Sequence, residues 1–313
     1  MSASAGALAP DIAAAVAALR AGDLVAFPTE TVYGLGADAR NPAALRKIYA
    51  LKGRPATHPL ILHLQSADDL KDWVADVPAS ARALADRFWP GPLTLVLPRA
   101  PEVSDVLTGG QDTIAIRVPS HPVARQLLAA FGGGIAAPSA NRYGRVSPTR
   151  AAHVREEFSE DLLVLEGGDC EVGLESTIVS LIDDLPRLLR PGAISRTEIE
   201  AVLGRSVQVG ADAAAPRVPG STAQHYAPQT PVELVRPESL DAAVVAASAR
   251  GQRVAVLPCP VGSDPSSYGR ALYAELRRLD KLGVSRILVE DVPHTPPWDA
   301  VRDRLSRAAA TFL

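Results

Sequence analysis

Four cations stand where apolar segments of the sequence end, and their positions are suited to binding anions. Lys52 and Arg54 follow a helical pattern, whereas Arg117 and Arg190 lie in or at the end of aliphatic segments. An unpaired charge buried in a strand costs several kcal/mol, so Arg117 needs an anion. That anion is either an internal Asp or Glu or the carboxylate or phosphate of a ligand. For Lys52 and Arg54, the simpler interpretation is a favourable interaction with the dipole of the preceding helix.

Hydroxyl side chains gather at the ends of the same segments. They fall in three stretches, which carry Thr29, Thr31 and Tyr33, then Ser139, Ser147 and Thr149, then Ser176 and Thr177. Taken singly, each stretch reads as a turn or a helix cap. Likewise, a lone histidine such as His63 is more often a hydrogen-bonded, half-buried residue than a catalyst. Together, cations and hydroxyls without a catalytic nucleophile indicate chemistry that positions and neutralises phosphates.

One glycine-rich stretch suggests another chemistry. Residues 34–39, GLGADA, fit the G-x-G-x-x-G/A pattern that positions a dinucleotide. We reject this interpretation because the preceding residues are too polar for a buried parallel strand and the next helix begins only at Asn41. The sequence also has no Walker A pair, no HExxH, no GxSxG and no cysteine-histidine grouping, so it predicts no metal site.

Short apolar runs alternate with helical patterns over the first two thirds of the chain, which predicts an α/β domain. Strands are expected at residues 24–29, 60–64, 93–98, 113–119, 134–139, 162–167, 176–182 and 187–190. A first helix is expected to begin near Pro10 and to end before Gly22, with Ile12, Val16 and Leu19 on one face. Further helices are expected at residues 42–52, from 66, and at 78–88, 121–131, 149–158 and 195–203.

The composition changes between residues 210 and 230, where proline, glycine, alanine and polar residues leave no periodic apolar face. We interpret this segment as a linker. Beyond it, strands at 232–235, 253–258 and 287–290 alternate with helices near 238–250, 266–282 and 298–310. This pattern predicts a small parallel α/β domain over residues 231–313, after a first domain over residues 1–209.

The composition is that of an ordinary soluble protein. The chain has 313 residues, a net charge of −3 and 47% hydrophobic residues. It has no apolar run of the roughly 18 residues that a membrane helix needs, and its start lacks the basic residues of a signal peptide. Cys170 and Cys259 match no redox or metal spacing, so we expect both to be buried in a cytoplasmic protein.

Seven stretches, in this order, resemble one family closely. They are FPTETVYGLGADA, LKGRPATHPLILHL, WPGPLTLVL, DTIAIRVPSHP, IAAPSANRYGRVSPT, GLESTIVS and LLRPGAIS. The sequence is similar to the YrdC-type threonylcarbamoyl-AMP synthases, and HYAP at residues 225–228 resembles their longer, two-domain branch. The resemblance covers nearly the whole chain. It implies a twisted mixed sheet with helices, followed by a smaller Rossmann-like parallel α/β domain.

The resemblance implies that L-threonine, bicarbonate and ATP give L-threonylcarbamoyl-adenylate and pyrophosphate, the first step toward threonylcarbamoyladenosine in tRNA. The implied threonine site consists of Thr31, His63, Arg117, Ala137 and Ser176, with Arg117 as the carboxylate clamp. The implied ATP site consists of Arg54, His58, Thr113, Ser139, Ser147, Arg190 and Tyr226. Lys52 and Arg54 are the implied catalytic residues, which act on the charge of the triphosphate. Mg²⁺ is expected to accompany ATP, with no other cofactor.

The same resemblance predicts that the linker covers the active site and that other proteins receive the product. Because Tyr226 lies in the linker, we expect residues 210–230 to fold over the nucleotide and to exclude water. The implied partners are the tRNA threonylcarbamoyl-transfer proteins that receive the adenylate. Weak contact with tRNA is compatible with this scheme, and no membrane is involved.

Two other functions are considered. The carbamoyl-transfer domain of hydrogenase maturation proteins shares this type of sheet, but those proteins carry cysteine-rich zinc segments that this sequence lacks. A nonenzymatic module for double-stranded RNA would use a basic concave face, which the net charge of −3 makes less attractive. Pyrophosphate release that requires both threonine and bicarbonate separates the enzyme from the RNA-binding module.

Overall fold

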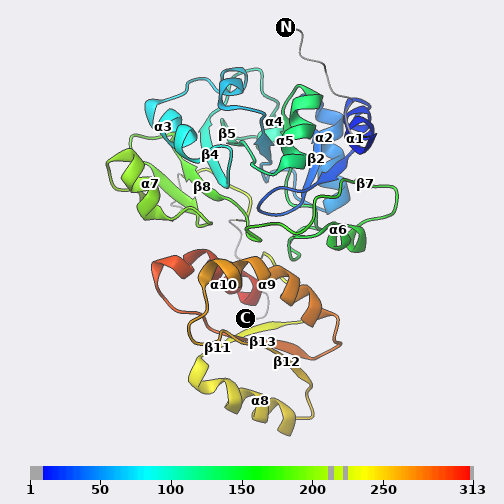
Figure 1. The fold of residues 1–313 in the computed structure, drawn as a ribbon, viewed down its shortest axis with the longest axis vertical. Coiled ribbons are helices and arrows are strands. Elements are labelled where there is room, and N and C mark those ends of the chain that lie inside the picture. The colour runs from blue at the N-terminus through cyan, green and yellow to red at the C-terminus, as the bar shows by residue number, and fades with distance from the viewer. Residues whose placement is uncertain (1–9, 211–214, 221–224, 311–313) are drawn as a thin grey trace.

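A computed structural model of the chain describes residues 10–210, 215–220 and 225–310 (Figure 1). Within these ranges the strands form one sheet of ten strands and one of three. The two sheets belong to separate parts of the chain, one before the predicted linker and one after it. The predicted class, a mixed α/β sheet domain followed by a small parallel α/β domain, is confirmed.

The large sheet mixes parallel and antiparallel pairs in the order β10-β9-β8-β4-β5-β3-β6-β2-β1-β7. Its strands are β1 (Val25–Phe27), β2 (Gly34–Asp38), β3 (Ile61–His63), β4 (Leu93–Pro98), β5 (Thr113–Arg117), β6 (Ile135–Ala136), β7 (Leu163–Val164), β8 (Thr177–Ser180), β9 (Arg187–Arg190) and β10 (Gln208–Val209). Strands β3 and β5 are parallel, whereas β4 is antiparallel to β5 and parallel to β8. Since β9 is antiparallel to β8, the carboxyl ends of β3, β5 and β9 lie at the same edge of the sheet.

Helices pack around this sheet and bury the apolar faces that the sequence predicts. They are α1 (Pro10–Arg20), α2 (Pro42–Lys52), α3 (Ala79–Phe88), α4 (Asp105–Thr108), α5 (Pro122–Phe131), α6 (Ala151–Glu157) and α7 (Arg196–Leu203). Ile12, Val16 and Leu19 of α1 share a core cluster with Leu127 and Leu128 of α5. The predicted helical face of α1 is therefore the buried one.

The starts of helices α2 and α7 agree with the predicted ones, because capping residues mark them in the sequence. The Asn41 side chain accepts hydrogen bonds from the backbone of Ala43 and Ala44 and starts α2, which then ends at Gly53 in the left-handed conformation. Ser195 and Glu198 form a reciprocal capping box at the start of α7. These contacts join residues that are two to four positions apart, so they can be recognised in the sequence.

Several sequence predictions are wrong in detail. Residues 34–38 form strand β2, which the sequence analysis did not predict, and the short elements α4 and β10 were also missed. The helix expected from residue 66 is only a 3₁₀ segment, η1 (Ala67–Asp72), although its Ser66 capping box is present. Strand β2, with the sequence GLGAD, is paired on both sides with the antiparallel strands β1 and β6, and Leu35 and Ala37 are fully buried. This pairing and burial outweigh its weak intrinsic preference for a strand.

The second domain is a three-stranded parallel sheet in the order β11-β13-β12. Its elements are β11 (Val232–Val235), η2 (Pro237–Ser239), α8 (Leu240–Ala249), β12 (Val254–Leu257), α9 (Pro265–Asp280), β13 (Arg286–Glu290), η3 (Pro296–Trp298) and α10 (Asp299–Ala309). Helix α8 covers one face of the sheet, whereas α9 and α10 lie between the sheet and the large domain (Figure 1). The expected linker over residues 210–230 falls partly outside the described residues, so its full extent stays a prediction.

Both cysteines are free and buried, as the sequence analysis expects. No helix in the described ranges combines the length and the apolar character needed to cross a membrane.

Candidate active site

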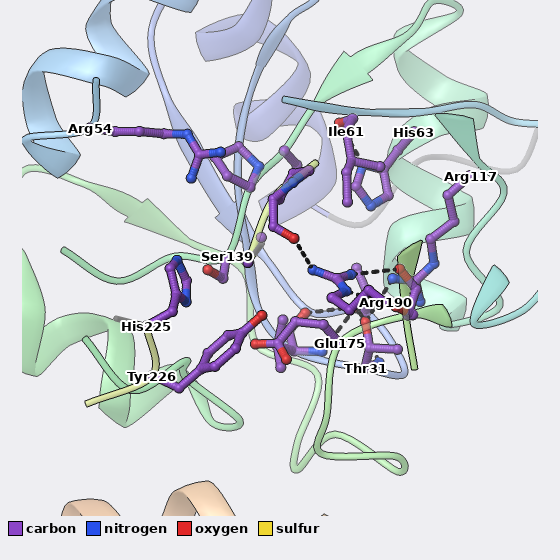
Figure 2. Close-up of a pocket in the computed structure, with 18 residues that line it drawn as sticks. Thr31, Arg54, Ile61, His63, Arg117, Ser139, Glu175, Arg190, His225 and Tyr226 are labelled. Atoms are coloured by element: carbon purple, nitrogen blue, oxygen red, sulfur yellow. Dashed lines mark hydrogen bonds between the residues drawn. The ribbon is translucent and has the colours of Figure 1, made fainter. Parts of the chain in front are cut away.

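A pocket lies at the edge of the large sheet where β3, β5 and β9 end (Figure 2). Ligands of α/β sheets commonly bind at the carboxyl ends of strands. Side chains from distant parts of the sequence surround the space in Figure 2. The lining residues are Thr29, Thr31, Val32, Gly34, Arg54, Ile61, His63, Arg117, Ala137, Pro138, Ser139, Glu175, Ser176, Arg190, Pro219, Gly220, His225 and Tyr226.

The structure brings most of the predicted site residues to this one pocket. Those that line it are Thr31, Arg54, His63, Arg117, Ala137, Ser139, Ser176, Arg190 and Tyr226. Four others do not line it: Lys52, His58, Thr113 and Ser147. Thr113 begins the same strand that Arg117 ends, so it lies about 13 Å from Arg117 along β5. The two residues therefore face different ends of the sheet.

Strand register places three polar side chains in one row. Arg117 pairs with His63 on one side and with Thr94 on the other, so all three project from the same face of the sheet. Arg117 is 3% exposed and forms a 2.7 Å ion pair with the Glu30 carboxylate. It also donates to the Thr31 hydroxyl at 2.7 Å. In this structure, the anion that Arg117 needs is therefore internal.

Burial and charge fix the protonation states around Arg117. Burial would raise the pKa of Glu30, but the charge and hydrogen bond of Arg117 lower it below its ordinary value. Burial and then the positive charge of Arg117 lower the pKa of His63 to about 3. His63 is therefore neutral near pH 7, and its Nδ1 lies 3.2 Å from the carbonyl oxygen of Ile61. A carbonyl only accepts, so Nε2 is left as the acceptor nitrogen of the ring.

Arg190, at the end of β9, is anchored by neutral groups alone. Its Nε and Nη2 donate to the backbone oxygen and the hydroxyl of Ser176 at 3.0 and 3.1 Å, and its Nη1 donates to the Pro219 oxygen at 2.9 Å. The Ser176 hydroxyl is also 2.7 Å from that of Thr94. No carboxylate of the described residues lies within ion-pair distance of Arg190. A buried guanidinium that is hydrogen-bonded only to neutral groups favours an anionic ligand.

Lys52 and Arg54, at the end of α2, have different roles in the structure. Lys52 is buried and donates to the backbone oxygens of Ser139, at 2.6 Å, and of Asn141. Burial and the charge of Arg54 lower the pKa of Lys52 well below its ordinary value. Lys52 therefore holds the loop that carries Ser139, in addition to its place in the last turn of α2. Arg54 lines the pocket, and its Nε has no hydrogen-bond partner among the described residues.

His225 and Tyr226 bring the predicted linker into the pocket wall. They are only 6% and 1% exposed. Tyr226 has a positive φ of 63°, which is uncommon for a residue with a side chain and is typical of functional sites. Gly220, with φ of 78°, makes room for it, because a Cβ at this position would lie 2.0 Å from the Tyr226 hydroxyl. A change of Gly220 to any other residue would displace the tyrosine.

Two residues outside the pocket contact residues that line it or flank it. Ser147 donates to the Glu175 carboxylate at 2.5 Å. His58 is half-buried, and its Nδ1 lies 3.1 Å from the hydroxyl of Tyr143, whose ring packs near Arg54. Glu175 stands in the GLESTIVS stretch, and no role is predicted for it from the sequence. The signal that could have singled it out is a carboxylate beside the Ser176 hydroxyl, next to a predicted strand.

The pocket residues do not form a metal site. Among the described residues, no three His, Cys, Asp or Glu side chains lie together so that they could hold a metal ion. The carboxylate that lines the pocket, Glu175, is already bound by Arg304. The described lining of the pocket therefore supplies no set of ligands for a resident metal ion.

Two buried histidines predict how stability depends on pH. Burial lowers the pKa of His63 and of His225 to about 3, from the ordinary 6.5. Below about pH 6.5 the unfolded chain binds protons that the folded chain does not, so stability falls as the pH drops toward 3. Each histidine adds a slope of up to about 1.4 kcal/mol per pH unit.

We therefore expect the midpoint temperature of unfolding to fall between about pH 6.5 and pH 5. A His63→Asn variant should show a weaker dependence, and His294→Asn, at an exposed position, is the control. A midpoint that does not change over this range would contradict the assignment.

Known proteins resemble this chain over nearly its whole length. Residues 17–192 match the family model Sua5_yciO_yrdC, described as telomere recombination, and residues 194–310 match the model of the threonylcarbamoyl-AMP synthase C-terminal domain. Threonylcarbamoyl-AMP synthase of Bacillus subtilis is 41% identical over 96% of this chain and 93% of its own. That of Pyrococcus abyssi is 39% identical over 93% and 92%. The crystal structure of P. abyssi Sua5 complexed with L-threonine covers 95% of this chain and 94% of its own, with a TM-score of 0.90 at 39% identity.

These matches, together with the fold, define a two-domain enzyme of the nucleotidyltransferase type. The similarity extends across both domains. The chain belongs to the threonylcarbamoyl-AMP synthase family, in its two-domain form.

Proposed function

We propose that this protein condenses L-threonine, bicarbonate and ATP into L-threonylcarbamoyl-adenylate, with release of pyrophosphate and water. The observation that carries the proposal is that three buried guanidinium groups, Arg54, Arg117 and Arg190, line one pocket. A site with this much positive charge suits one carboxylate and one triphosphate together. The product is then passed to the proteins that transfer the threonylcarbamoyl group to tRNA.

The threonine side of the pocket is assigned to Thr31, His63, Arg117, Ala137 and Ser176. Arg117 retains the Glu30 ion pair and exchanges its neutral partner, the Thr31 hydroxyl, for the threonine carboxylate. Exchange of a neutral acceptor for a charged one strengthens the hydrogen bond. His63, neutral and with Nε2 as acceptor, receives a hydrogen bond from the amino acid.

The nucleotide side is assigned to Arg54, Ser139, Arg190 and Tyr226, which line the pocket, with His58, Thr113 and Ser147 as proposed contacts outside its lining. The orphaned Nε of Arg54 and the Arg190 guanidinium are the donors that face the phosphates. Once a carbamate has formed on the threonine amine, its oxygen attacks the α-phosphate in line and pyrophosphate leaves. Fixed cations act on the charge that develops on the transferring and leaving phosphates. Lys52 does not line the pocket, but its hydrogen bond to the backbone oxygen of Ser139 holds the loop that carries Ser139.

The linker is assigned the role of a cover over the nucleotide. His225 and Tyr226 line the pocket and are buried, so they separate this part of the site from water. Exclusion of water strengthens the electrostatic interactions inside and protects a labile adenylate from hydrolysis.

RNA binding by the same face is disfavoured. An RNA backbone is bound by exposed cations that can reach its phosphates. Arg54, Arg117 and Arg190 are no more than 7% exposed. The pocket therefore suits small anions rather than a duplex.

Pyrophosphate release is the experiment that tests the proposal. We expect release only when L-threonine, bicarbonate and ATP are all present, and an adduct of threonine, CO₂ and AMP should be detectable by mass spectrometry. Release without threonine, or none at all from the full chain, would overturn the proposed reaction. A chain that ends at Val209 should turn over more slowly, whereas an unchanged rate would make the linker a passive connection.

A further inference from the structure

The second domain contributes side chains to the wall of the pocket. Arg304 of α10 donates through Nε to the Glu175 carboxylate at 2.8 Å, and the Tyr273 hydroxyl of α9 donates to the same oxygen at 2.9 Å. From the first domain, Ser147 donates to the other carboxylate oxygen at 2.5 Å. Arg304 is fully buried, with 0% of its surface exposed. The Glu175 carboxylate is thus held from both domains.

The contact between the domains at this point is close. A Cβ at Gly173, where φ is 75°, would lie 2.5 Å from the Cα of Arg270 in α9, so only glycine allows this approach. The ring of Tyr226 stacks on that of Tyr273 with centroids 5.8 Å apart, and the Arg304 guanidinium lies 5.2 Å from the Tyr226 ring. A second buried ion pair, Arg277 with Glu157 at 2.8 Å, also joins the two domains. Arg304 is therefore fixed by packing as well as by charge.

Glu175 is a negative charge in a pocket whose other charged lining residues, among those that the structure describes, are the cations Arg54, Arg117 and Arg190. Burial would raise its pKa, but the charges of Arg304 and Arg190, with hydrogen bonds from Ser147 and Arg304, lower it to about 2. The carboxylate is therefore ionised at neutral pH. Without Arg304, the most favourable partner left for it is Arg190, which has only neutral partners in this structure. A carboxylate paired with Arg190 would compete with phosphate for the same guanidinium.

We propose that Arg304 is a positioning residue for the nucleotide. By binding Glu175 it holds that carboxylate away from Arg190 and leaves Arg190 available to the ATP phosphates. This inference rests on the proposed function and gives the second domain a part in it: the domain sets the charge of the ATP site. Tyr273 supports the same carboxylate with a neutral hydrogen bond, so its contribution is smaller.

The test compares nucleotide affinity in variants of the full chain. Arg304→Gln is expected to weaken binding of a nonhydrolysable ATP analogue at least about tenfold, with little change in the Kd of threonine. Tyr273→Phe, which keeps the ring stack, should weaken it about two- to threefold. Arg302→Gln is the matched control, because Arg302 lies on the same helix and pairs with Asp299 away from the pocket. Circular dichroism and thermal melts check that each variant is folded.

Removal of the carboxylate separates positioning from packing. In the double variant Arg304→Gln with Glu175→Gln, the carboxylate that competes for Arg190 is gone, so nucleotide affinity should recover most of the loss. Asp303, the other carboxylate that Arg304 binds, keeps its ion pair with Arg307. Unchanged affinity in folded Arg304→Gln, or a double variant no better than the single one, would overturn the proposal. Nucleotide affinity is measured without turnover, so the two proposals can fail separately. A wild-type chain that binds the analogue but forms no adenylate would overturn the proposed function, whereas the comparison of nucleotide affinity between the variants would still test the role of Arg304.

Discussion

Arg54→Ala is expected to lower the rate of adenylate formation by about 10²- to 10³-fold, the usual effect of removing one fixed donor from a developing charge. Arg54 lines the pocket, is 7% exposed, and has an Nε with no hydrogen-bond partner among the described residues. Alanine leaves the phosphates without this donor and adds no compensating group. The measurement is pyrophosphate release at saturating threonine and bicarbonate, with ATP varied.

Arg46→Ala provides the matched control for Arg54. It removes the same charge at an exposed position in α2, the helix that ends two residues before Arg54. The control should keep its activity and its affinity for ATP. Normal ATP-dependent product formation by a folded Arg54→Ala variant would contradict the assignment of Arg54 to the nucleotide site.

Arg117→Gln is expected to cause the largest loss of stability and to abolish threonine binding. The ion pair of Arg117 with Glu30 is buried, with side chains that are each 4% exposed. Removal of one partner from a buried pair costs about 3–5 kcal/mol, because the other charge is left uncompensated. For a chain of this size, we expect the midpoint temperature of unfolding to fall on the order of 10 °C. Calorimetry with threonine as the titrant measures the loss of binding.

A surface pair and a double variant test the physical reason for the loss at Arg117. Arg150→Gln breaks an ion pair with Asp169 whose partners are 51% and 53% exposed, so the change should be below about 1 kcal/mol. The double variant Glu30→Gln with Arg117→Gln should regain stability but not threonine binding. If the double variant is as unstable as Arg117→Gln alone, the loss does not come from an unpaired charge.

The local elements of the fold could be predicted because their causes are local. Strands β4, β9 and β11 and helix α2 have the predicted bounds. Asn41, Pro42 and Gly53 mark the two ends of α2, and alternating or aliphatic segments mark the strands. Strand β2 was missed since its residues, GLGAD, have no side-chain signal for a strand, and only burial between β1 and β6 makes it one.

The candidate site could be predicted in part. The types of the residues indicated an anion-binding site, and resemblance to a family supplied the predicted roles. Sequence could not show that Arg117 has an internal partner in Glu30, or that Lys52 faces a loop instead of the pocket. Both facts depend on which segments become neighbours in space.

The sequence by itself determined the class of fold, the order of the two domains and which cationic residues are suited to binding anions. Periodicity, capping and charge are properties of short segments, so they can be recognised without the tertiary structure. Only the tertiary structure decided how that charge is distributed. It pairs Arg117 with Glu30, leaves Arg190 with neutral partners, and brings Arg304 across 129 residues to Glu175. The physical reason is that the cost of a buried charge depends on its neighbours, and the neighbours are chosen by the packing of the whole chain.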